Sequence, residues 1–145
     1  MTAAHEALFA QSEPATSGSS SGATGTLGPA RVLSLEKLEE RKTATGAGWS
    51  VVHGTLATGE TVNLHESMQN AGAPAVQLHT IQHTEFLVPL EGEVEFRHET
   101  GGQVVTERAK PGDVIYIPLG TRHAVHNAGT VPARYVVMGI GGDAK

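Results

Sequence analysis

Cysteine is absent from this chain of 145 residues. The absence excludes disulfide bonds, thiolate metal ligands and a cysteine nucleophile, but it does not indicate a compartment, because reducing and oxidising environments both tolerate it. Long apolar runs are absent too. The stretch Val136-Val137-Met138 is typical of the apolar runs present, whereas a membrane-spanning helix needs about 20 apolar residues. The sequence therefore predicts no membrane span.

Basic side chains are also scarce. The chain has 10 Lys and Arg against 15 Asp and Glu, which gives a formal net charge of −5. Nucleic acids and anionic membrane surfaces are bound through clustered Lys and Arg that displace counterions. We therefore expect neither a nucleic acid nor a membrane as a partner.

The first 30 residues differ in composition from the rest of the chain. They are rich in Ser and Gly and contain almost no large apolar side chain after Phe9, so they cannot bury enough surface to offset chain entropy. We predict a disordered, flexible leader over residues 1–30 and a single domain over 31–145. Residues 7–11 resemble the end of a secretory signal, but no basic or apolar region precedes them. A cytoplasmic location is expected, and export to the periplasm with a trimmed leader is the alternative.

From Trp49 onward the side-chain pattern has a period of two. Residues 51–56 alternate in this way, and residues 93–97 form the clearest half-buried strand, with polar side chains alternating with Val94 and Phe96. Turn signals recur about every 8 to 12 residues, and no helical period is found beyond residue 41. The pattern predicts an all-β antiparallel sandwich or barrel.

Histidine is the unusual component, with 8 residues in the chain. Four of the histidines fall in two short stretches, and the first stretch, residues 79–86, also carries Glu85. If the backbone is extended, positions 79, 81, 83 and 85 lie on one face and present His, Ile, His and Glu. Neutral imidazole and carboxylate are ligands that borderline divalent metal ions accept.

The second stretch follows the spacing G-x5-P-x-G-x2-H-x3-N at Gly112, Pro118, Gly120, His123 and Asn127. This spacing resembles the second signature of the cupin superfamily. The first cupin signature ends H-x-H, then three or four residues, then E-x6-G, and His79, Glu85 and Gly92 match its first histidine, its glutamate and its closing glycine. The resemblance covers roughly residues 50–140.

Similarity to cupins implies a double-stranded β-helix, which is a small RmlC-like jelly-roll barrel that usually forms a homodimer. It also implies one divalent metal ion per chain, Fe, Mn, Ni, Cu or Zn, held in the mouth of the barrel by the motif histidines and glutamate. The fixed glycines and proline of the second motif are expected to shape the turn that presents His123 to the interior.

This sequence departs from the family pattern at one ligand position. Ile81 stands where the second histidine of the first signature is expected, and its side chain cannot bind a metal. Three interpretations follow. His83 replaces the missing ligand, which gives the predicted metal site His79, His83, Glu85 and His123. Alternatively, His79, Glu85 and His123 form a three-ligand site of two histidines and one carboxylate with open positions, or the metal has been lost.

The remaining candidates have simpler interpretations. His126 lies an odd number of residues from His123, so it is expected on the opposite face, at the surface or in an interface. Asn127 is expected to form hydrogen bonds that close a turn or the barrel. His53 and His65 lie on predicted strands without a motif partner, and we interpret both as structural.

No catalytic triad, phosphate-binding glycine loop or pair of catalytic carboxylates accompanies the histidines. A bound metal would therefore have to carry the chemistry. We expect a metal-dependent enzyme that acts on a small oxygenated organic substrate as an oxygenase, isomerase or lyase. The alternative is a non-catalytic cupin module that binds a small molecule or a metal.

Overall fold

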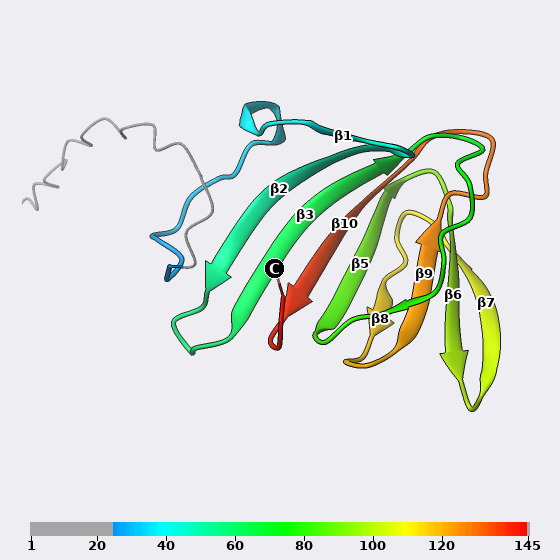
Figure 1. Cartoon of the computed structure of the whole chain (residues 1–145). Helices are drawn as coiled ribbons and strands as arrows, with labels where there is room; N and C mark the ends of the chain where they lie inside the picture. Colours follow the sequence, from blue (N-terminus) through cyan, green and yellow to red (C-terminus); the bar gives the residue numbers. More distant parts are fainter. Residues whose placement is uncertain (1–24, 145) are drawn as a thin grey trace, which may run out of the picture.

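The computed structural model describes residues 25–144, which form two antiparallel β-sheets (Figure 1). One short 3-10 turn, η1 (Leu35–Lys37), precedes the strands. The strands are β1 (Arg41–Thr43), β2 (Gly46–Thr55), β3 (Thr61–Gln69), β4 (His79–Thr80), β5 (Thr84–Glu91), β6 (Val94–Thr100), β7 (Gln103–Ala109), β8 (Ile115–Ile117), β9 (Arg122–His126) and β10 (Ala133–Ile140).

The larger sheet has six strands in the order β1-β2-β3-β10-β5-β8, and the smaller sheet has four in the order β4-β9-β6-β7 (Figure 1). Neighbours in a sheet are mostly distant in sequence, because the chain crosses repeatedly between the sheets. The main core cluster contains residues of both sheets, so the core lies between them. Its members are Leu87, Val94, Phe96, Ala109, Ile115, Ile117, Ala133, Tyr135 and Val137. The all-β jelly-roll architecture expected from the sequence is confirmed.

Strand β6 shows how the sequence pattern produces this arrangement. Val94 and Phe96 are 0 % and 6 % exposed and face the core, whereas Glu95 and Arg97 alternate with them on the outer face. The same alternation turns His98 inward, on the side of Phe96. Strand β6 therefore contributes both core and polar side chains to the space between the sheets.

Gly92 allows the tight connection between β5 and β6. Its φ angle is +70°, and a Cβ atom there would lie 2.6 Å from the carbonyl oxygen of Pro132. Both observations restrict the position to glycine, since other residues are strained at positive φ and would clash with the neighbouring backbone. The closing glycine of the first motif thus keeps the β5–β6 turn against the start of β10.

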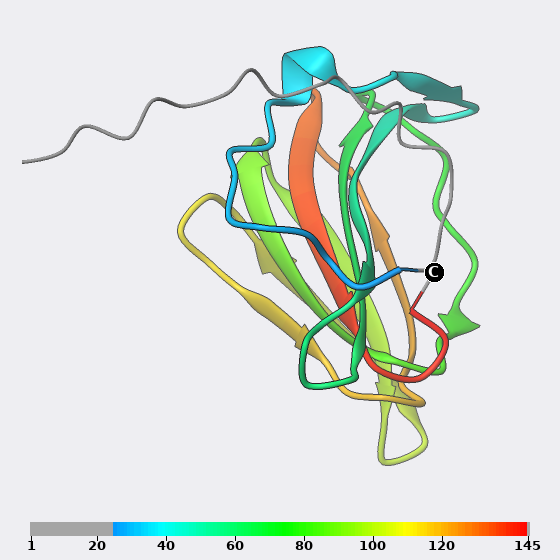
Figure 2. The same cartoon turned by 90° about the vertical axis from the view of Figure 1, so that its left-hand side faces the viewer.

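The predicted leader lies largely in residues 1–24, outside the described residues. At the start of the described chain, Thr26 forms a parallel bridge with Thr55, and Leu27 N donates to Thr55 O at 2.9 Å. In Figure 2 this segment runs from the end of β2 to η1 (blue to cyan). Between residues 25 and 144, no helix is long and apolar enough to cross a membrane.

Candidate functional site

Three of the four predicted ligand residues line one cavity of about 300 Å³ between the sheets: His79, Glu85 and His123. His79 on β4 pairs directly with His123 on β9, and their ring centroids are 4.8 Å apart. Glu85 enters from β5 in the larger sheet, and its Oε2 lies 3.7 Å from His123 Nε2. The fold therefore brings together side chains from both cupin-like motifs and from three strands.

His123 is the most firmly held of these side chains. It is 3 % exposed, and its Nδ1 lies 3.1 Å from the carbonyl oxygen of Thr121. Because a carbonyl oxygen only accepts, Nδ1 carries the proton and Nε2 keeps a free lone pair. Burial lowers the pKa of His123, so the ring stays neutral at ordinary pH. A neutral, oriented imidazole is the form that binds a metal ion.

His79 is held less tightly than His123. It lies on the two-residue strand β4 and is exposed, and its Nδ1 is 3.4 Å from the carbonyl oxygen of Gln77. The ring of His123 beside it limits where the His79 ring can lie. His79 is therefore the candidate ligand with the most freedom to rotate.

His83 has a different environment from the other candidates. Its Nε2 lies 2.9 Å from Glu85 Oε1, and its Nδ1 lies 2.8 Å from Asp143 Oδ1. Burial opposes protonation, but the hydrogen bonds to Asp143 and Glu85 outweigh it and raise the pKa of His83. Both ring nitrogens therefore contact carboxylates, and the ring does not line the cavity formed by His79, Glu85 and His123. The assignment of His83 as a fourth ligand stays a prediction.

Ile81, at the departure from the family pattern, packs against the core cluster and is partly buried. Its carbonyl oxygen accepts a hydrogen bond of 3.1 Å from Gly120 N. The backbone of this residue thus joins the two motifs, while its side chain adds to the hydrophobic core.

The side chains do not form a complete metal site as they stand. Among residues 25–144, no group of three or more His, Cys, Asp or Glu is arranged so that it could hold a metal ion. Metal binding through His79, Glu85 and His123 therefore requires side-chain adjustment.

Two further histidines near the site were not expected to belong to it. His98 on β6 pairs with His123 in register, so His79, His123 and His98 occupy one row across the smaller sheet. His98 stacks on Phe96 with a centroid distance of 4.7 Å, and its Nε2 lies 2.9 Å from Glu107 Oε2. Inward-facing residues alternate along β6, and this alternation continues from Phe96 to His98. It is the sequence signal that places His98 on the inner face, near the site.

His65 on β3 also lines the cavity, although the sequence pattern favoured a purely structural role. Burial lowers the pKa of His65, so it presents a neutral ring. Ser67 and Gln69 follow it at a period of two and line the same cavity. This alternation of polar residues on β3 is the signal that indicates a polar cavity wall.

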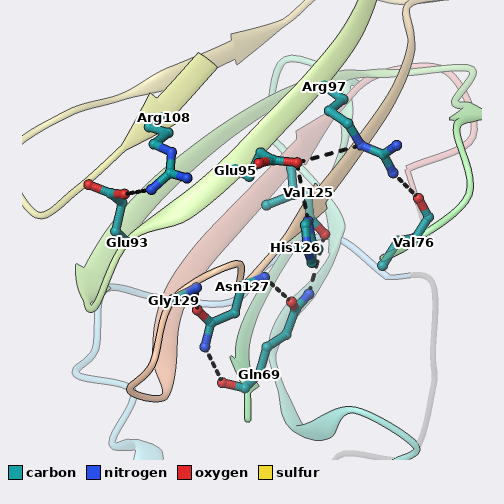
Figure 3. Close-up of polar contacts among 10 residues, drawn as sticks. All are labelled: Gln69, Val76, Glu93, Glu95, Arg97, Arg108, Val125, His126, Asn127 and Gly129. Carbon is teal, nitrogen blue, oxygen red and sulfur yellow. Dashed lines mark hydrogen bonds and ion pairs between the residues drawn. The ribbon is translucent and has the colours of Figure 1, made fainter. Parts of the chain in front are cut away.

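Asn127 forms the turn-closing hydrogen bonds that its motif position predicts. Figure 3 shows it beside Gln69 and Gly129. It is 1 % exposed, its Nδ2 donates to Val131 O at 2.7 Å, and its backbone N donates to Gln69 Oε1 at 2.7 Å. Gln69 Nε2 in turn donates to the hydroxyl oxygen of Tyr135 at 2.7 Å. The second motif therefore also fixes Gln69 and Tyr135, two side chains of the cavity wall.

His126 lies on the face of the smaller sheet opposite to His123, as expected from its spacing, because it pairs with Glu95 whereas His123 pairs with His98. Its side chain is only 11 % exposed, and its Nδ1 lies 3.7 Å from Glu95 Oε1 (Figure 3). Arg97 pairs with Glu95 at 3.9 Å and donates to the carbonyl oxygen of Val76, a residue of the cavity wall. This outer-face cluster attaches the segment before β4 to the smaller sheet.

Comparison with solved structures shows the same fold elsewhere. The W96F variant of oxalate decarboxylase from Bacillus subtilis superposes with a TM-score of 0.65 at 18 % sequence identity, covering 81 % of this chain and 32 % of that chain. The chain thus spans about a third of that relative's length. An RmlC-like cupin protein from Methanocaldococcus jannaschii gives a TM-score of 0.49 at 16 % identity, covering 55 % of this chain and 70 % of that one. At 18 % identity the likeness to the decarboxylase shows the fold alone.

A search of curated proteins finds no match to this sequence. The family model for the cupin domain matches residues 64–139, which is slightly more than half of the chain and includes both motifs. The motif match and the two-sheet architecture together show that this chain belongs to the cupin family.

Proposed function

We propose that the cavity binds one divalent metal ion through His79, Glu85 and His123, and that a small oxygenated organic molecule binds beside it. The observation that supports this most directly is the convergence of two imidazoles and a carboxylate from three strands on a single cavity. Two histidines and one carboxylate with open positions form a known metal-binding combination.

The spacing of Glu85 and His123 fits a shared metal ion. The distance of 3.7 Å between Glu85 Oε2 and His123 Nε2 is too long for a hydrogen bond. It is close to the roughly 3.4 Å that separates two ligands when each lies about 2.1 Å from a tetrahedral zinc ion. The neutral His123 ring, with Nδ1 donating to Thr121 O, directs its free Nε2 lone pair toward this position.

The contacts of His83 support a three-ligand site. An imidazole whose two nitrogens both donate to carboxylates has no lone pair for a metal ion. His83 instead holds Glu85 Oε1, which leaves Oε2 on the side of His123. In this proposal His83 orients a ligand, as hydrogen-bonding partners of metal ligands commonly do.

With three protein ligands, a bound metal ion would retain open positions at which it can lower the pKa of water, polarise a carbonyl or, if redox-active, activate dioxygen. The surrounding side chains would bind and orient the substrate. His65, Ser67 and Tyr135 line the cavity and offer neutral hydrogen-bonding groups. Leu87, Val125 and Val137 supply apolar contacts. Oxygenase, isomerase or lyase chemistry on a small oxygenated molecule is consistent with this lining.

A second candidate function is a non-catalytic module that binds a small molecule without a metal. The ion pair of His83 with Glu85 favours it, because this pair competes with a metal ion for the carboxylate. In this case the polar wall of the cavity would bind the ligand directly.

Metal content per chain, measured by elemental mass spectrometry, separates these functions. After reconstitution with Fe, Mn, Ni, Cu or Zn, the wild type should retain close to one metal ion per chain. His123→Ala should lose it, while His83→Ala should retain it when metal is in excess. Loss in both variants would instead indicate the four-ligand site. A wild type that retains none of these metals would overturn the metal-dependent function and leave the non-catalytic module.

A further inference from the structure

A second cavity, of about 240 Å³, adjoins the one that contains the candidate ligands. The two cavities share four lining residues, His65, Ser67, Gln69 and Tyr135. The second cavity extends from these side chains toward the edge strand β1 and the turn after it, where Arg41, Thr43 and Thr45 line it. The two cavities are therefore neighbours along this row of side chains.

The second cavity exists because a side chain is missing from one row of the larger sheet. Gly48 pairs with Arg41 on one side and with Ser67 on the other. Directly paired residues project to the same face, so the row has a gap between Arg41 and Ser67. A Cβ atom at Gly48 would lie 3.5 Å from Glu66 O, which is an ordinary contact, so the backbone itself leaves the space free.

Arg41 is an exposed residue that lines this cavity and gives it a positive charge. Over residues 25–144 it forms no ion pair, although Arg97, Arg108, Arg122 and Arg134 each pair with a glutamate. No carboxylate lines the second cavity, and its other polar groups are hydroxyls, an amide and the His65 ring. This is notable in a chain with a net charge of −5. The lining therefore favours an anionic group.

We infer that the two cavities form one binding site for a small organic acid, with its carboxylate at Arg41 and its other oxygen-bearing end at His79, Glu85 and His123. Arginine binds a carboxylate through two parallel hydrogen bonds, and Thr43 and Thr45 lie on the same wall to donate further ones. The shared residues Ser67 and Tyr135 lie between the two ends of the site. This inference rests on the proposed function and adds the substrate class.

The test is calorimetric titration of succinate, with its uncharged diamide as the neutral comparison, against the full chain in metal-free and reconstituted forms. Wild type should bind succinate and bind the diamide at least about tenfold more weakly, since a hydrogen bond to a charged group is lost. Arg41→Gln should weaken succinate binding by roughly 10- to 100-fold. The control is Lys42→Gln, because Lys42 is the neighbouring cation and lines neither cavity. This variant should change the affinity for succinate by no more than about twofold.

A second pair of variants tests whether succinate needs the gap at Gly48, independently of the charge of Arg41. Gly48→Leu should fill the gap and abolish succinate binding, whereas Gly48→Ala, for which the structure has room, should keep it. Metal content should stay unchanged in Arg41→Gln, because Arg41 does not line the cavity of the candidate ligands.

The outcomes separate this inference from the proposed function. Arg41-dependent succinate binding by a chain that never retains metal would overturn the metal site and uphold the organic-acid site. If the chain retains one metal ion but neither the metal-free nor the reconstituted form binds succinate, the metal site is upheld and the organic-acid site is overturned. Two other results would also overturn the organic-acid site. One is an equal weakening of succinate binding in Lys42→Gln and Arg41→Gln, and the other is tighter binding of inorganic phosphate than of succinate.

Discussion

His83 Nε2 lies 2.9 Å from Glu85 Oε1, so one oxygen of this carboxylate is bound by His83 while the other lies 3.7 Å from His123 Nε2. The opposite ring nitrogen of His83 lies 2.8 Å from Asp143 Oδ1. Because carboxylates accept hydrogen bonds, these two contacts favour the protonated ring and raise the pKa of His83, against the opposing effect of burial. The C-terminal turn is thereby connected to the candidate metal site.

Removing this connection should weaken metal binding without abolishing it. In His83→Ala, Glu85 loses the partner that fixes its orientation, and we expect metal affinity to fall by roughly 10- to 100-fold, the usual effect of losing a ligand's supporting hydrogen bond. Asp143→Ala should have a smaller effect in the same direction. Competition titration against a chelating dye measures both.

The matched control for these variants is Glu107→Ala. It removes a carboxylate from another histidine, His98, at a distance of 2.9 Å, and leaves Glu85 untouched. Metal affinity should be unchanged. An equal loss in Glu107→Ala and His83→Ala would show that the effect is general destabilisation rather than ligand orientation.

The C-terminal turn that carries Asp143 offers a separate prediction about stability. Gly141 and Gly142 both have positive φ, +72° and +52°. A Cβ atom at Gly142 would lie 1.8 Å from Gln82 O, whereas one at Gly141 meets nothing within 4 Å. Gly141→Ala should cost about 1 kcal/mol of unfolding free energy, the penalty of a left-handed alanine.

Gly142→Ala should cost more than Gly141→Ala, because its backbone clash adds to the same conformational penalty. The clash would also push Asp143 away from His83, so metal affinity should fall as in Asp143→Ala. Thermal unfolding and metal titration of the two variants provide the comparison. Equal unfolding temperatures and equal metal affinities would contradict this account of the turn.

Asn127 should be among the most costly polar residues to replace. Its side chain is buried and donates to Val131 O at 2.7 Å and accepts from Gly129 N at 2.9 Å. Asn127→Ala leaves these backbone groups without partners, so we expect a loss of about 3 kcal/mol or more in unfolding free energy. Urea denaturation measures it.

The exposed neighbour Asn70 serves as the comparison for Asn127. Asn70→Ala keeps the backbone hydrogen bonds of that residue and should change the unfolding free energy by less than about 0.5 kcal/mol. Similar losses for the two variants would contradict the assignment of Asn127 as the residue that closes the β9–β10 connection.

Short-range patterns predicted much of the fold and part of the site. The two motifs marked His79, Glu85 and His123, and the structure places all three around one cavity although they lie on three different strands. Their binding of a metal ion stays a prediction. Alternation on β6 correctly predicted its buried face. Asn127 formed the expected hydrogen bonds, since they close a local turn.

The remaining features depend on contacts between distant segments. His83 contacts Asp143 across 60 residues, and no local pattern indicates that pairing. Arg41 lines a cavity only because β1 pairs with β2 opposite Gly48. His65 and His98 lie outside both motifs, and their strand registers bring them beside the site. Sequence periodicity gives a side chain its face, but register between strands decides its neighbours.

Ile81→His introduces the histidine of the family pattern and tests whether this position can supply a metal ligand. The Ile81 side chain packs against the core cluster, and its carbonyl oxygen is held by Gly120 N at 3.1 Å. A histidine there would replace apolar contacts with a polar ring, so we expect a loss of about 1–3 kcal/mol in the unfolding free energy of the metal-free chain.

Metal should separate the two possible outcomes for Ile81→His. If the new ring can turn toward His79 and His123, saturating metal should recover the lost stability and the variant should bind metal more tightly than wild type. If the ring stays among the core residues, metal affinity should not rise and the variant should remain less stable with metal present. We expect the second outcome, because the backbone contact with Gly120 fixes the position from which this side chain projects. Thermal unfolding with and without metal, compared with Ile81→Val as the apolar control, measures the difference; tighter metal binding by Ile81→His would contradict the expectation.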